Sequence, residues 1–202
     1  IQEGTSPSSL AVLYRTNFQS RALEEAFLNY GVSYQLLGTK FYERKEIKDV
    51  LSYLRLAMNP SSSADLARII NEPARGIGKV TMLKVIEGRR GDLTGAALEK
   101  VSRFDDMMMD IAAEARTKKL SVALKFIIAR TGMETEFKKS GTDEDLSRLE
   151  NLRELVSIAT RYDEMDIEAG IEAFIETVAL QSDQDELKDK TEQDAVRLMT
   201  VH

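Results

Sequence analysis

Short apolar runs lie near the two ends of the chain. Residues 10–14 and 32–37 each form a brief, mostly apolar run, and residues 196–201 form a third. Runs of this length bounded by turn residues are typical of strands that are buried on both faces of a sheet. Apolar residues recur at helical spacing between the first two runs, over residues 22–30. The sequence therefore predicts a strand–helix–strand unit with parallel strands and a right-handed crossover.

The middle of the chain has an almost purely helical pattern. Apolar spacing predicts helices over residues 46–58, 64–70, 79–87, 102–116, 121–131, 143–162 and 167–180. Thr16 or Asn17 can cap the first helix, Gly31 can end it, and Thr142 can cap the helix that begins at Asp143. Segment 181–194 is highly charged without an apolar face, which predicts a mobile linker.

Strand signals at both ends with helices between them indicate an insertion. The predicted fold class is α/β plus all-α: a small parallel sheet that is interrupted by a large helical subdomain, with helix predominating. The predicted division is residues 1–75 for the first part of the sheet domain, 76–194 for the helical insertion and its linker, and 195–202 for the returning strand.

Composition excludes several kinds of site. The 202 residues include no Cys, and His202 is the single His. Disulfides, thiolate catalysis, Cys-based or multi-His metal sites and a Ser/His/Asp triad are therefore excluded, and we predict no metal site. No apolar run approaches the ~20 residues of a membrane-spanning helix. Because the chain does not begin with Met, we expect it to be a piece of a longer protein.

The net charge of −6 conceals an uneven distribution. Residues 1–140 carry 22 basic and 17 acidic side chains, whereas residues 141–195 carry 5 basic and 17 acidic ones. The first part could face an anionic polymer, and the second would repel it.

Tyr14 and Arg15 follow the first predicted strand, where ligands of open α/β sheets bind. An aromatic ring there can stack on a base, and a guanidinium can hold a phosphate through two hydrogen bonds. The alternative interpretation is a core tyrosine beside a surface arginine.

A Gly-rich turn, Arg75-Gly76-Ile77-Gly78-Lys79, leads into a predicted helix. The glycines allow close backbone approach, and the helix start presents N–H groups to an anion. Residues 68–90 carry six basic and two acidic side chains, which favours contact with the backbone of duplex DNA. An ordinary turn remains the alternative.

Residues 107–109 are three consecutive Met, which could form an adaptable partner surface but more often provide core residues plus one exposed side chain.

Three stretches together resemble the UvrD/PcrA/Rep group of superfamily 1 DNA helicases. Residues 11–21 (AVLYRTNFQSR) look like motif IV, residues 41–55 (FYERKEIKDVLSYLR) resemble the segment after it, and residues 196–202 (VRLMTVH) are similar to the opening of motif V. Residues 73–78 (PARGIG) also fit the group's pattern.

The resemblance implies a partial RecA-like motor domain with an inserted accessory subdomain, often called 2B. It also implies site residues. Tyr14 would stack on the adenine of ATP, and Arg15 would act catalytically as an arginine finger on the γ-phosphate, with Gln19 and Arg21 as secondary nucleotide contacts. The turn at 75–79 would touch duplex DNA, and Thr200 and His202 would lie near the single strand. Arg44 and Glu46 would pair at the surface.

The resemblance further implies an ATP-dependent 3′-to-5′ DNA helicase of repair or replication, located in the cytoplasm and using ATP and Mg²⁺. The Lys-Ser/Thr phosphate loop and the Asp-Glu metal box of that group do not occur in this sequence. We therefore expect this chain alone to hold no cofactor and to be inactive. The alternative function is a regulatory module that gates the motor or docks repair proteins, without binding DNA itself.

Overall fold

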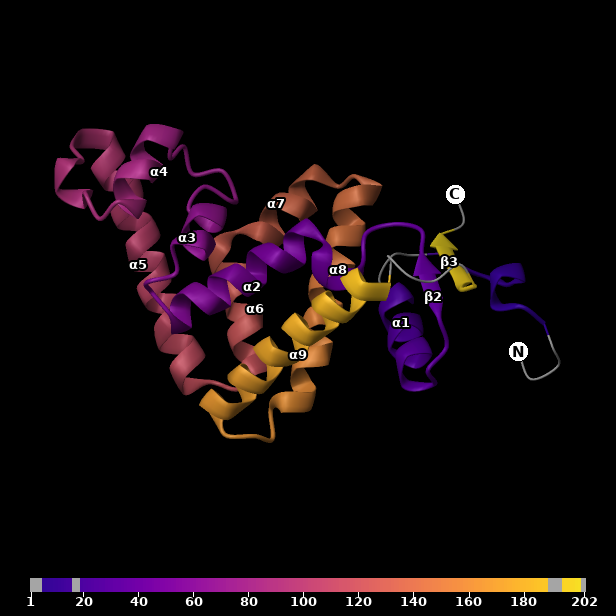
Figure 1. The fold of residues 1–202 in the computed structure, drawn as a ribbon. Coiled ribbons are helices and arrows are strands. Elements are labelled where there is room, and N and C mark those ends of the chain that lie inside the picture. The colour runs from indigo at the N-terminus through magenta and orange to yellow at the C-terminus, as the bar shows by residue number, and fades with distance from the viewer. Residues whose placement is uncertain (1–4, 16–18, 189–193, 201–202) are drawn as a thin grey trace.

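The computed structural model describes residues 5–15, 19–188 and 194–200, with the side chains of 182–188 excepted (Figure 1). It is predominantly helical with one small parallel sheet, which confirms the predicted fold class. Thr16, Asn17 and His202, to which the sequence assigned roles, lie outside the described residues.

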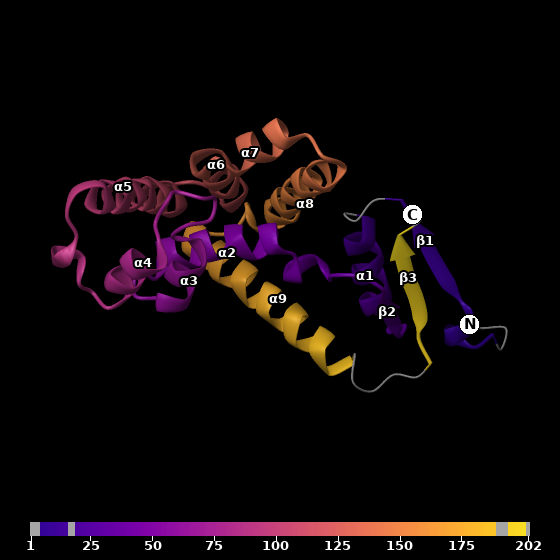
Figure 2. The same cartoon turned by 90° about the horizontal axis from the view of Figure 1, so that it is seen from above.

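The sheet joins the two ends of the chain. Its strands are β1 (Ala11–Tyr14), β2 (Tyr34–Leu36) and β3 (Val196–Thr200), in the order β1-β3-β2 and all parallel. The returning strand thus lies between the first two, as the insertion requires (Figure 2). Tyr14 is opposite Thr200, so the carboxyl ends of β1 and β3 meet at one edge.

Helix α1 (Gln19–Asn29) packs on the sheet and completes a small core of its own. Buried Tyr14, Tyr34, Leu36 and Leu198 contact Leu23, Phe27 and Leu28 of this helix. Gly31, with a φ of +63°, ends the helix as predicted, because glycine enters the left-handed region without a steric penalty.

Eight helices of the described residues form the larger unit. They are α2 (Lys45–Met58), α3 (Ser63–Ile69), α4 (Lys79–Ile86), α5 (Gly95–Thr117), α6 (Leu120–Thr131), α7 (Met133–Ser140), α8 (Asp143–Ala159) and α9 (Ile167–Lys188). Short 3₁₀ turns occur at Pro7–Ser9, Phe41–Glu43, Arg90–Asp92 and Thr160–Tyr162. Thr142 caps α8 as predicted, because its hydroxyl accepts a hydrogen bond from the Asp145 N–H at 3.2 Å.

Two helical predictions were incomplete. The sequence pattern missed α7, which is separated from its neighbours by Gly132 and Gly141 at φ values of +86° and +63°. The linker predicted over 181–194 was wrong as far as Lys188, because α9 continues to that residue. Glu, Gln, Leu and Lys favour helix even where no apolar face is present.

A second hydrophobic core runs from Phe41 to Val178. Ile47, Val50 and Leu54 of α2 are fully buried in it. The change from one core to the other occurs between Leu36 and Phe41, and the domain boundary at residue 75 stays a prediction. Both views place the sheet at one end of the molecule and α4 at the other (Figures 1 and 2).

Candidate functional site

An open groove lies at the carboxyl edge of the sheet. It has a volume of about 530 Å³ and is lined by Val12, Leu13, Tyr14, Arg15, Gln19, Ala22, Leu23 and Glu154. Arg15 is exposed on this groove, and half-buried Thr200 ends the neighbouring strand. The topology therefore brings Arg15 and Thr200, which are 185 positions apart in the sequence, to one edge.

Tyr14 belongs mainly to the core beneath the groove. Only 8% of its surface is exposed, and the Ser20 hydroxyl hydrogen-bonds its phenol. Burial raises the pKa of Tyr14, and the nearby carboxylate of Glu24 raises it further. The ring of Tyr14 is packed in the core of this chain, and its stacking on adenine stays a prediction.

The two secondary candidates for nucleotide contact, Gln19 and Arg21, have different surroundings in the structure. Gln19 lines the groove, but its side-chain oxygen accepts a hydrogen bond from the backbone N–H of Arg15 at 3.1 Å. Arg21 is 4% exposed, lies 3.4 Å from Glu25 and stacks over the ring of Tyr42. It does not line the groove, and its nucleotide contact stays a prediction.

The resemblance implied that Arg44 and Glu46 pair at the surface, but they do not. Both are buried, and Asn151 of α8 joins them: it accepts a hydrogen bond from Arg44 at 2.7 Å and donates one to Glu46 at 2.6 Å. Arg44 also donates to the hydroxyl of Ser20 in α1 at 2.8 Å. These polar contacts join the sheet unit to the helical unit.

A salt bridge reinforces the same junction. The guanidinium of Arg161 binds Glu25 of α1 through two hydrogen bonds of 2.6 and 3.2 Å. The hydrogen bond from Arg161 lowers the pKa of Glu25 below its ordinary value of 4.5.

The turn at 75–79 lies at the opposite end of the molecule, where α4 begins (Figure 1). Arg75 faces inward: its guanidinium donates to the carbonyls of Ile69 and Pro73 and to the hydroxyl of Tyr53, at 3.1, 3.0 and 2.6 Å. Ile77 is 3% exposed. Both side chains support the turn from within, and their DNA contacts stay predictions.

The outer part of the turn is accessible. Gly76, Gly78 and Lys79 are exposed, and Lys100 of α5 donates to the carbonyl of Gly76 at 3.0 Å. Lys100 was missed because no sequence signal links α5 to a turn 24 residues earlier. The glycine backbone with two lysines forms a small cationic tip.

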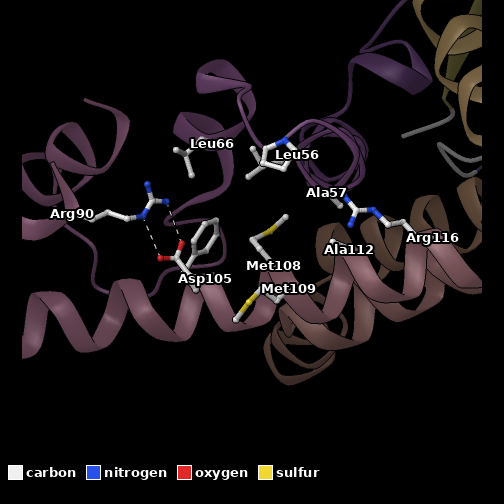
Figure 3. A pocket seen from close by; sticks show the side chains of 11 residues that line it. Leu56, Ala57, Leu66, Arg90, Asp105, Met108, Met109, Ala112 and Arg116 are labelled. Carbon is white, nitrogen blue, oxygen red and sulfur yellow. Dashed lines mark hydrogen bonds and ion pairs between the residues drawn. The ribbon is translucent and has the colours of Figure 1, made fainter. Parts of the chain in front are cut away.

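The three consecutive methionines are arranged as core residues plus one exposed side chain, which is the second of the two interpretations of the sequence. Met107 is 4% exposed and packs in the larger core, whereas Met109 is 64% exposed. Met108 and Met109 line a cavity of about 340 Å³ between α2, α3 and α5 (Figure 3). An ion pair between Arg90 and Asp105, at 3.2 Å, crosses one side of this cavity (Figure 3).

Among the described residues, no group of three or more His, Asp or Glu side chains is arranged to hold a metal ion. Within the same residues, every helix is too short or too polar to cross a membrane.

This chain is similar in sequence to proteins that are named as DNA helicases. The model of the UvrD-like helicase C-terminal domain matches residues 2–202. The ATP-dependent DNA helicase PcrA of Bacillus subtilis is 34% identical over 215 residues, and DNA helicase II of Escherichia coli is 36% identical over 220 residues. These alignments cover 96% and 98% of this chain but only 29% and 30% of the two relatives.

Proposed function

We propose that this chain, which belongs to the family of UvrD-like helicase C-terminal domains, forms one part of an ATP-dependent DNA helicase. The names of the similar proteins from B. subtilis and E. coli support this activity, and the chain spans about three tenths of their length. In the proposal, the whole protein uses ATP and Mg²⁺, moves 3′ to 5′ on DNA and acts in repair or replication. The sheet unit is part of the motor, and the helical unit is its accessory insertion.

Within that activity, the sheet edge at Arg15 and Thr200 contacts single-stranded DNA. The observation that carries this assignment is the pairing of β1 with β3, which sets Tyr14 opposite Thr200. The resemblance had placed Arg15 at a nucleotide and Thr200 at the single strand, yet the two residues share one edge. Because Tyr14 offers little ring surface to adenine, the assignment of Thr200 is the better guide to the edge.

Arg15 is suited to hold a phosphate of the strand. Its guanidinium is exposed and can make two parallel hydrogen bonds to a phosphate. The hydrogen bond from its backbone N–H to Gln19 anchors the main chain from which the side chain extends. Phosphate contacts fix the position of a strand without reading its sequence. The site therefore fits a protein that moves along DNA of any sequence.

Fluorescence anisotropy with a labelled oligo-dT strand tests this contact. Arg15→Ala should weaken binding and reduce the salt slope of log affinity by about 0.7, the value for one phosphate of a single strand. Arg130→Ala is the matched control, because this exposed arginine pairs with Asp110 in the helical unit. An Arg15→Ala variant with unchanged affinity and salt slope would refute the assignment.

The γ-phosphate of ATP is the second candidate ligand for Arg15. The groove volume of about 530 Å³ is within the range of small-molecule sites and therefore favours it. If Mg-ATP displaces the oligonucleotide, and Arg15→Ala weakens ATP binding alone, this second assignment holds. In either case we expect no ATP turnover by the isolated chain above that of Arg15→Ala, since the phosphate loop and the metal box are not in its sequence.

The cationic tip at Gly76, Gly78, Lys79 and Lys100 is the proposed contact for duplex DNA. Its support is the exposure of the glycine backbone beside two lysines at the end of the molecule remote from the sheet. A Lys79→Ala/Lys100→Ala variant should lose duplex affinity at low salt, whereas Lys125→Ala on α6 should not. Equal binding by both variants would contradict the proposal.

A further inference from the structure

We infer that Arg44 is a positioning residue, which acts through Arg15 by holding in place the backbone that leads into it. This inference rests on the proposed phosphate contact of Arg15. Arg44 touches neither that groove nor its ligand, because it does not line the groove. Its effect passes through the start of α1 and through Tyr14.

The guanidinium of Arg44 bonds to three separate parts of the chain. It donates to Ser20 of α1 at 2.8 Å, to Asn151 of α8 at 2.7 Å, and to the carbonyl of Thr39 at 3.3 Å. It also stacks on the ring of Phe41, 5.4 Å from the ring centre. Only 7% of Arg44 is exposed, so these contacts are shielded from water. Such a guanidinium fixes the elements that it joins more firmly than a surface ion pair does.

Two short paths connect Arg44 with Arg15. On one side, Ser20 receives the hydrogen bond from Arg44 and itself hydrogen-bonds Tyr14, the residue before Arg15. On the other side, Gln19 is the neighbour of Ser20 and accepts the hydrogen bond from the Arg15 N–H. The backbone from which Arg15 extends is therefore held at the residue before it and at its own N–H group, by Ser20, which Arg44 binds, and by the neighbouring Gln19.

The same guanidinium relates the groove to the helical unit. Asn151 and Glu154 lie one helical turn apart on α8, so Asn151 binds Arg44 while Glu154 forms part of the groove wall. Arg44 thus fixes the position of the backbone that leads into Arg15 and the position of α8, which carries Glu154 of the groove wall.

Lysine cannot replace Arg44 in this arrangement. A guanidinium carries five donors in a rigid planar fork, whereas an ammonium has three donors on one atom. Arg44→Lys keeps the positive charge beside buried Glu24 and Glu46 but cannot reach Ser20, Asn151 and Thr39 together. It therefore removes the positioning while leaving the charge balance intact.

The test measures oligo-dT affinity and thermal stability for Arg44→Lys, Arg15→Ala and the double variant. Arg44→Lys should weaken binding by about 3- to 10-fold, because a misplaced contact loses much of its strength. The double variant should bind as Arg15→Ala does, within about 2-fold, since coupled residues are not additive. Arg68→Lys is the control: it disturbs an arginine 2.7 Å from buried Asp49, far from the groove, and should lower stability without changing affinity. Ser20→Ala, which removes one hydroxyl, is the milder variant and should weaken binding in the same direction.

The outcomes separate this inference from the proposed function. If Arg15→Ala weakens binding but Arg44→Lys and Ser20→Ala bind as the wild type, Arg44 is not a positioning residue. If Arg44→Lys weakens the oligo-dT affinity of the Arg15→Ala variant by a further 3- to 10-fold, Arg44 acts independently of Arg15 and the inference also fails. If Arg15→Ala itself has no effect, the proposed strand contact fails and the inference fails with it.

Discussion

Arg75→Ala should destabilise the fold and leave duplex DNA affinity nearly unchanged. Its guanidinium hydrogen-bonds three oxygens, those of Ile69, Pro73 and Tyr53, and lies 5.7 Å from the ring centres of both Tyr53 and Phe104. Truncation removes these contacts and opens a gap between α2 and α5. The phosphate-binding alternative predicts the opposite pattern, with loss of DNA affinity and no loss of stability.

The size of the effect follows from the contacts. A hydrogen bond to a charged group contributes roughly 1.5–3 kcal/mol, and a cation–π contact contributes about 0.5–2 kcal/mol. These values do not add, because Arg75 is only half-buried and Tyr53 retains its hydrogen bond to the Glu72 carbonyl at 2.6 Å. We expect a total loss of about 3 kcal/mol. For a chain of this length, such a loss lowers Tm by about 6–12 °C.

Urea denaturation and anisotropy with a labelled duplex, at several salt concentrations, measure the two effects separately. The matched variant is Lys79→Ala, four residues along the same turn but exposed. It should leave Tm unchanged and reduce the salt slope by about 0.9, the value for one phosphate of B-form DNA. An Arg75→Ala variant that keeps its Tm and loses salt slope would refute the reasoning.

Further predictions concern the turn, the groove and the junction. Gly76→Ala should cost about 1–2 kcal/mol in urea denaturation, because Gly76 has a φ of +68° and a Cβ there would lie 2.9 Å from Lys100, whereas Gly78→Ala should stay within about 0.5 kcal/mol. Equal costs would contradict this. Glu154→Gln should raise oligo-dT affinity about 2- to 5-fold in anisotropy, because it removes a negative charge from the groove wall; unchanged or weaker binding would count against the groove as a phosphate site. Arg161→Gln should cost about 0.5–1 kcal/mol at pH 7. The pKa of Glu25 is lowered in the folded state, so this stabilisation is present above pH 4.5 and disappears as pH falls through the lowered pKa. Denaturation at pH 7 and pH 3 should show the difference shrink at the lower pH, and a constant difference would exclude Glu25 as the partner.

The pattern of apolar residues was sufficient for the layout of the fold. Buried strands and amphipathic helices have different periods, so β1, α1, β2 and most of the bundle follow from local sequence. The parallel return of β3 followed from the strand signals at the two ends. Helix α7 was missed because its eight residues offer a single buried apolar position, Met133.

Side-chain roles were much harder to predict, above all for arginine. The resemblance placed Arg44 at the surface, paired with Glu46, and charged residues are indeed rarely buried. Its burial depends on Asn151, which lies 107 residues later in the chain. Local sequence contains no record of such a partner. Tyr14 likewise combines a typical position for ligand contact with a core environment that only the packing of α1 reveals.

The same effect explains why a count of basic residues overstates the positive charge that residues 68–90 leave unpaired. Five of the six basic side chains there bind protein groups of the described chain: Arg68, Arg75, Lys84, Arg89 and Arg90. Lys79 is exposed and is not among these five, and Lys100 joins it at the tip from outside that segment. Six phosphate contacts would give a salt slope of about −5.4 for duplex binding, whereas two give about −1.8. A measured slope near −2 would support the tip of two lysines, and a slope near −5 would mean that the internal ion pairs open when DNA binds.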